Sequence, residues 1–499
     1  MHRRDILQAG RSGRLIAGLG LLLAAWAVGN APFSSPDEAQ HFIRAASLVR
    51  GQVVGDPPTS PVPAASGREQ VRLLWQRKTT RSVTIPARLN PAGLDCNALR
   101  PDLPADCEQP APGGGSLRVE SSVGTYEPLP YVAPGLATLL VSSSATAALR
   151  AARLAAAALA LALLALGLSA APRGFWSPIG VALALTPGGL FVLAGVGANS
   201  LEIAGAIALA IALFSYCTTG TANRRVLVAS ATGGFAMVAS RPTSVIWLAL
   251  AAGVAALCAE RPRLLVASGG ARIVAVVWAA GIVASAAWNL AVEPSPPHGV
   301  SAAGVRAAID LLPELLRELV GVFGALDTRP PAWLALPILG ALALLVIRAC
   351  ALCGPRIRAA IGVLVVAAIL LPAVLDATVL WFTGFALQGR HVMALAVMAP
   401  ILAGVALDAR GAGASRATRW AFALVWATTQ IAYWLYNAHR HAVGVSGSWT
   451  FLGTRPDWLP GPWSLWLALA VLGASLAAWA LATAPGPARE GPPVPHRAR

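Results

Sequence analysis

The chain has 499 residues, of which 56% are hydrophobic and 12% are charged, and its formal net charge is +16. So few charged side chains exclude a water-soluble domain of this length, whereas helices that cross a lipid bilayer need long apolar segments. The basic excess does not indicate nucleic-acid binding, because the arginines lie mostly between hydrophobic segments, as the positive-inside rule describes. We therefore predict an all-α, multi-pass protein whose partner is the lipid bilayer and which has no nucleic-acid partner.

The first hydrophobic segment follows a basic lead and is predicted to be an uncleaved transmembrane helix rather than a signal peptide. A long polar loop, residues 32–127, comes next and is expected on the extracytoplasmic side. From residue 37 to residue 127 it holds ten basic and ten acidic side chains, so the loop itself is neutral. Its Cys96 and Cys107 are close enough in sequence for a disulfide. Residues 83–85 are expected to form a short strand.

Hydrophobic segments return from residue 128, and we expect 12 or 13 hydrophobic helices in the whole chain. Arginines mark cytoplasmic helix ends consistently only from residue 200 onward. One earlier segment is therefore expected not to cross. The best candidate is 129–142, which is short and contains prolines; alternatively, the end carrying Arg150 and Arg153 is wrongly assigned. A second outer loop holds an amphipathic stretch, 306–320, that suits a helix lying on the membrane.

These observations divide the chain into six parts. They are a cytoplasmic lead with the first transmembrane helix (1–31), the extracytoplasmic loop (32–127), a transmembrane core (128–291), an outer loop with the interfacial helix (292–331), C-terminal transmembrane helices (332–484) and a cytoplasmic tail (485–499).

Two adjacent carboxylates, Asp37 and Glu38, stand at the start of an expected amphipathic helix just after the first hydrophobic segment. One interpretation is purely structural. Ser35 would cap the helix, Pro36 would occupy its first position, and Glu38 would complete a capping box. The other interpretation is chemical, with Asp37 as a general base or as a ligand of a divalent metal such as Mg or Mn. Both roles are compatible if Glu38 closes the cap while Asp37 faces a site.

Several other polar residues, Glu293 among them, are expected near the same side of the membrane. Ionisable groups at membrane depth are costly and commonly functional, so their grouping suggests a polar cavity that opens outward. Arg241 and Arg390 suit a phosphate, because a guanidinium forms two parallel charged hydrogen bonds; interfacial anchoring is the alternative. Asp327 lies in a glycine-containing turn, where capping of the next helix is its structural alternative.

The motifs resemble those of a bacterial family of multi-pass membrane proteins known only as a domain of unknown function. Residues 35–45 are similar to its Pro-Asp-Glu-x-x-His-x-x-Arg-Ala signature, and 388–391 to its Gln-Gly-Arg-Tyr, with His391 in place of tyrosine. Residues 128–131, 199–204 and 323–328 resemble three further elements. That family in turn resembles the GT-C class of integral-membrane glycosyltransferases, in which a carboxylate in the first outer loop serves catalysis.

The resemblance implies a GT-C-like glycosyltransferase that moves a sugar from a polyprenyl-phosphate donor to an envelope glycan or lipid at the outer face of the bacterial cell membrane. The alternatives are a transporter or flippase for lipid-linked saccharides and a non-catalytic assembly factor; the sequence shows no internal repeat of the kind that favours a carrier. The candidate residues are Asp37 and Glu38 for catalysis and His41, Arg44, Arg241, Asp327, Gln388, Arg390 and His391 for substrate binding.

Overall fold

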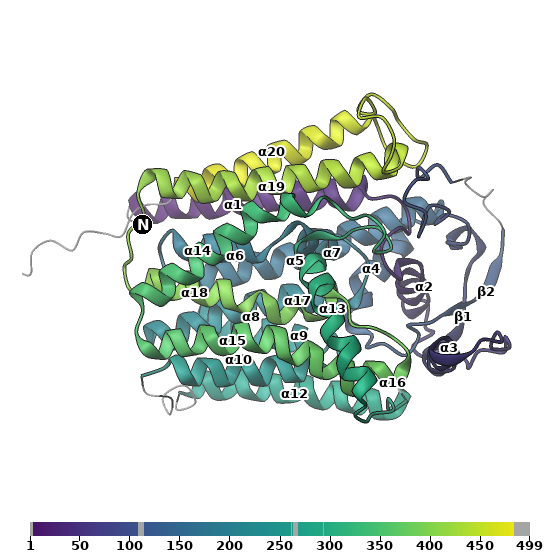
Figure 1. Cartoon of the computed structure of the whole chain (residues 1–499), viewed down its shortest axis with the longest axis horizontal. Helices are drawn as coiled ribbons and strands as arrows, with labels where there is room; N and C mark the ends of the chain where they lie inside the picture. The colour runs from purple at the N-terminus through teal and green to yellow at the C-terminus, as the bar shows by residue number, and fades with distance from the viewer. Residues whose placement is uncertain (1–2, 108–113, 261, 263–267, 293, 484–499) are drawn as a thin grey trace, which may run out of the picture.

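The protein is a bundle of long helices with a smaller polar part at one end. The computed structural model describes residues 3–107, 114–260, 262, 268–292 and 294–483; the expected tail, 485–499, lies outside them. The long helices lie side by side along the long axis, and the short elements of the first loop gather at the end opposite the N-terminus (Figure 1). We call this the loop end.

The predicted helical membrane architecture is confirmed. Within the described residues, eight helical segments are long and apolar enough to cross a membrane, or nine if one bent pair counts as a span. The eight are built from α1 (Arg3–Gly29), α5 (Ala145–Ala170), α8 (Ala198–Thr219), α12 (Gly269–Val292), α14 (Leu336–Leu352), α15 (Pro355–Leu375) with the short α16 (Trp381–Thr383), α17 (Gly389–Ala396) with α18 (Met398–Ala409), and α20 (Trp463–Ala482).

Other expected segments are helical but do not meet the same criteria of length and apolarity. The bent pair is α6 (Trp176–Ala184) and α7 (Pro187–Leu193), whose axes differ by 73°. The remaining apolar or mixed helices are α4 (Leu129–Leu140), α9 (Arg224–Val238), α10 (Ser244–Cys258) and α19 (Arg416–Val443). With the eight spans and the bent pair, these helices agree with the 12 or 13 hydrophobic helices that we expected within the described residues. They are not counted as spans because α4, α9 and α10 are short and α19 carries many polar side chains.

Helix α8 lies at the centre of the bundle, and almost all of its side chains are buried. Its alanine-rich sequence lets α5, α9 and α18 pack closely against it, as small residues do between membrane helices. The N-terminus of α8 points to the loop end. This places Asn199 and Glu202 beside the elements of the first loop.

The short helix α4 explains the irregular arginine pattern. It packs against α2 (Glu38–Leu48) at the loop end, and α5 begins there, because Arg153 of α5 bonds to carbonyls at the end of α1. Arg153 therefore does not mark the end of the bundle at which Arg11 bonds to Ala480. The expectation that 129–142 does not span the bundle agrees with this placement.

The first loop is held together by a sheet and a disulfide. Strands β1 (Arg81–Pro86) and β2 (Ser116–Ser121) pair antiparallel, so the strand is longer than the 83–85 expected, and α3 (Gly67–Thr79) precedes it. Cys96 and Cys107 are bonded to each other. The expected interfacial helix is α13 (Ala302–Gly321), which runs obliquely to the long helices (Figure 1).

Candidate functional site

The start of α2 differs from the predicted capping box. The helix begins at Glu38, and the residue at its cap position is Asp37, whose backbone lies in the left-handed region with φ 58°. Neither acid caps the helix through its side chain. A non-glycine residue in this region is strained, and such strain persists where surrounding contacts impose it. The cap hypothesis is therefore wrong for both carboxylates, and each is available for other contacts.

Glu38 forms a buried ion pair with Arg153, and these side chains are 1% and 3% exposed. The Nε of Arg153 donates to Oε1 of Glu38 at 2.8 Å, and its Nη2 contacts the other carboxylate oxygen. The same guanidinium donates to the carbonyls of Ala27, Asn30 and Ala31. The pair thus joins the end of α1 and the start of α5 to the first residue of α2, which lies next to Asp37.

Asp37 faces a different arginine. Its Oδ2 lies 2.5 Å from Nη2 of Arg390, and Nη1 of Arg390 donates to the carbonyl of Pro36 at 2.7 Å. The aspartate side chain is 52% exposed, whereas the arginine side chain is 12% exposed. Burial by itself raises the pKa of Asp37, but the charge and hydrogen bond of Arg390, together with the neighbouring His41 and Arg241, outweigh it and hold the pKa below its ordinary value.

Asn199 connects Arg390 to a second arginine. Its amide nitrogen donates to the Arg390 carbonyl at 3.2 Å, and its amide oxygen accepts from Arg241 at 3.3 Å. The same nitrogen lies 3.0 Å from Glu202, which also accepts from Ser244. Two guanidinium groups are therefore positioned near one carboxylate, Asp37, by a buried network at the start of α8.

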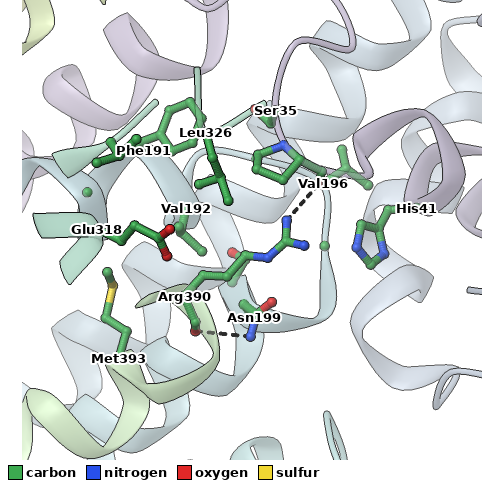
Figure 2. Close-up of a pocket in the computed structure, with 16 residues that line it drawn as sticks. Ser35, His41, Phe191, Val192, Val196, Asn199, Glu318, Leu326, Arg390 and Met393 are labelled. Atoms are coloured by element: carbon green, nitrogen blue, oxygen red, sulfur yellow. Dashed lines mark hydrogen bonds between the residues drawn. The ribbon is translucent and has the colours of Figure 1, made fainter. Parts of the chain in front are cut away.

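A small cavity of about 50 Å³ lies beside this network. Figure 2 shows Arg390 at its centre, with Asn199, His41 and Glu318 around it. Glu318 comes from α13, and its Oε2 accepts a hydrogen bond from the backbone nitrogen of Gly389 at 2.5 Å. A Cβ at position 389 would lie 2.6 Å from the Cβ of Glu318, so glycine is required there for α13 to approach α17.

A larger apolar cavity of about 590 Å³ also lies against α13. It is lined by side chains of α13, α14, α18 and neighbouring elements, including Leu316, Leu319 and Leu339. Val322 and Met393 line both this cavity and the polar one. An apolar space between membrane helices therefore adjoins the polar site that holds Arg390.

A comparison with models of protein families shows to which family the chain belongs. Residues 19–399 match the family model described as "Predicted membrane protein (DUF2142)". The chain belongs to this family. No curated protein and no solved structure matches the chain, so the likeness to GT-C enzymes still depends on the motifs.

In this DUF2142 chain, the acidic motif and the Gln-Gly-Arg-His motif meet at one site. His41 lines the cavity, and its Nδ1 lies 2.8 Å from the hydroxyl of Tyr131. Burial lowers the pKa of His41 to about 3, so the imidazole is neutral. His391 lies next to Arg390 and accepts from the backbone nitrogen of Gln388 at 3.4 Å, which places both residues at the start of α17.

Of the nine candidate residues, only His41 and Arg390 line the cavity itself, and two of the others, Arg44 and Asp327, have structural contacts. Arg44 is fully buried and donates to the carbonyls of Val53 and Tyr126, so it holds the first loop in place. Asp327 pairs with Arg440 at 2.9 Å. The neighbouring Leu326, rather than Asp327, lines the cavity.

Sequence reasoning did not identify Arg153 or Glu318 as part of the DUF2142 site. A signal existed for each. Arg153 departs from the arginine pattern of cytoplasmic helix ends, and Glu318 is a charged residue next to the apolar face of an amphipathic helix.

Metal binding requires several ligands at one place. Within the part of the chain that the structure describes, there is no group of three or more His, Cys, Asp or Glu side chains that could hold a metal ion. Glu293, one of the acids expected near the bilayer, is outside the described residues. The contact partner of Asp37 is a guanidinium, whose positive charge competes with a metal cation for the same carboxylate.

Proposed function

We propose that this protein is a membrane glycosyltransferase. It would move a sugar from a polyprenyl-phosphate donor to a hydroxyl group of a cell-envelope glycan or lipid, at the outer face of the bacterial cell membrane. The observation that carries the proposal is the contact between the exposed carboxylate of Asp37 and the largely buried guanidinium of Arg390, beside a polar cavity that adjoins an apolar one. The resemblance of the acidic motif to the first-loop carboxylate of GT-C enzymes supports it.

The two charged groups have complementary roles in such a transfer. Arg390 would bind the donor phosphate through charge-assisted hydrogen bonds, with Arg241 adding positive charge nearby. The oxygen of the acceptor hydroxyl would form a bond to the anomeric carbon of the donor sugar. Asp37 would accept the proton that this hydroxyl loses. The bond from that carbon to the phosphate oxygen breaks, and the negative charge stays on the lipid phosphate beside Arg390. No ATP is needed, because the phosphate is the leaving group.

The ion pair also gives a reason for Asp37 to act only after the donor binds. In the free protein Arg390 stabilises the charged form of Asp37 and makes it a weak base. A donor phosphate would compete for the same guanidinium. Once Arg390 contacts phosphate, the pKa of Asp37 rises and the carboxylate becomes a better proton acceptor.

The apolar cavity supports a lipid donor rather than a soluble nucleotide sugar. Its volume of about 590 Å³ lies in the range of small-molecule sites, and it opens among helices that are apolar enough to face lipid. Ala343 lines this cavity, and Ala343→Phe should lower the affinity for the lipid donor by about tenfold or more. Leu344→Phe is the matched control, because Leu344 is exposed on the same helix and is not part of the lining.

Glycan analysis of the cell envelope tests the proposal in cells. A deletion strain is complemented at equal membrane levels with wild type, Asp37→Asn or Asp56→Asn. Asp56 is the control, because it is an exposed acid of the same loop that pairs with Arg118. We expect wild type and Asp56→Asn to restore a missing sugar, and Asp37→Asn not to. Full restoration by Asp37→Asn would refute the role of Asp37 as the base.

A further inference from the structure

Glu318 lies where the two cavities meet. It belongs to α13, whose Leu316, Arg317 and Leu319 line the apolar cavity, while Glu318 itself lines the polar one. Figure 2 shows its carboxylate directed toward the side of the cavity that holds Arg390. If the chain of a lipid phosphate fills the apolar cavity and its phosphate contacts Arg390, the head group lies next to Glu318.

One carboxylate oxygen of Glu318 is held and the other is available. Oε2 accepts from the backbone nitrogen of Gly389, which fixes the side chain against the N-terminus of α17. Among the described residues, none donates a hydrogen bond to Oε1. An ionised carboxylate is an acceptor only, so its free oxygen can accept a hydrogen bond from a donor such as a hydroxyl group.

The surroundings of Glu318 distinguish it from the other acid on its helix. Partial burial raises the pKa of Glu318 above its ordinary value. Glu314, one turn earlier, instead pairs with Arg329 at 3.1 Å and does not line the polar cavity. Glu314 therefore offers a matched control on the same helix.

We propose that Glu318 binds hydroxyl groups of the sugar carried by the lipid phosphate and thereby selects which sugar the protein accepts. The inference rests on the proposed donor site, and it adds a specificity-determining residue that is not part of the acidic motif or of the Gln-Gly-Arg-His motif. A hydroxyl group that donates to a carboxylate contributes more to binding than a neutral pair, and a site built for it discriminates against a ligand that lacks it.

Binding to the full chain in lipid nanodiscs tests this directly. The probes are polyprenyl phosphate and its glucose, galactose and mannose derivatives, and the variants are Glu318→Ala, Glu318→Gln and Glu314→Ala. We expect Glu318→Ala to lower the affinity for at least one sugar-bearing probe by about tenfold or more. The reason is that a hydrogen bond to a charged group contributes about 1.5–3 kcal/mol. Its affinity for polyprenyl phosphate should change less than about twofold, and Glu314→Ala should change neither affinity.

The two Glu318 variants separate recognition from structure. The amide oxygen of Gln can still accept from Gly389, so a merely structural role predicts that Glu318→Gln behaves as wild type and that Glu318→Ala weakens all probes equally. Either of those results, or an unchanged affinity of Glu318→Ala for every sugar-bearing probe, would overturn the proposal. If the sugar-bearing probes depend on Glu318 but no sugar is ever transferred, the recognition site stands and the glycosyltransferase proposal fails. If sugar is transferred and its binding does not depend on Glu318, only the present inference fails.

Discussion

The buried pair between Glu38 and Arg153 should be among the most sensitive places in the fold. Its two side chains are 1% and 3% exposed, so removal of one partner leaves the other charge without compensation in a poorly solvated place. Breaking such a pair typically costs about 3–5 kcal/mol. Arg153→Met also removes the donors to three carbonyls at the end of α1, so we expect the free energy of unfolding to fall by about 4 kcal/mol.

The measurement is reversible unfolding of the purified protein in mixed micelles, followed by tryptophan fluorescence. Arg118→Met is the control, because Arg118 and Asp56 form a pair whose side chains are 56% and 69% exposed, and such pairs contribute about 0–1 kcal/mol. Glu38→Gln keeps the shape of the side chain and should be milder, at about 2–3 kcal/mol. If Arg153→Met folds and its stability lies within about 1 kcal/mol of wild type, the pair does not hold the start of α2 in place.

Three further predictions concern charge and the first loop. Arg390→Gln removes the charge that holds the pKa of Asp37 below its ordinary value, so the acid limb of kcat/KM for the residual activity should move to higher pH, and an unchanged limb in a pH–rate profile would contradict this. The pKa of His41 is lowered to about 3, so this side chain does not titrate between pH 5 and pH 8. His41→Gln should therefore leave the pH dependence of kcat/KM in that range unchanged, as measured in the same profiles. Replacing Cys96 and Cys107 by Ser removes a crosslink over a short loop and should destabilise the protein by about 2–3 kcal/mol in the unfolding assay, whereas no loss would show that packing alone holds the loop.

The membrane architecture could be predicted because it depends on composition and on the length of apolar segments. The helix α13 was equally accessible, since Leu311, Leu315 and Leu319 recur at the spacing of one helix face. The disulfide followed from two cysteines in one loop. The number of helices that span the membrane was harder to predict from the sequence. Helices α9, α10 and α19 lie near the limits of length or polarity for a span, and tertiary packing determines where they lie.

The site could be predicted only in part. The acidic motif and Arg390 are 353 residues apart in the chain, and the sequence connected them only through their expected side of the membrane and the family resemblance. The start of α2 was predicted wrongly, because the local pattern of Ser, Pro and Glu favours a capping box. Contact with Arg153 instead draws Glu38 inward, a long-range effect that no local pattern records. Glu318 was missed for the same reason, since its place in the cavity depends on the approach of α13 to Gly389.

Sugar transfer by the purified protein tests the central claim most directly. The full chain is reconstituted in liposomes with labelled polyprenyl-phosphate sugars and an envelope lipid extract as acceptor, and wild type is compared with Asp37→Asn and with the loop control Asp56→Asn. The account predicts that wild type and Asp56→Asn transfer label to the acceptor, and that Asp37→Asn still binds the donor but transfers at least about a hundredfold more slowly. Transfer by Asp37→Asn at the wild-type rate would contradict the account, and so would movement of intact donor across the bilayer without transfer by the wild type.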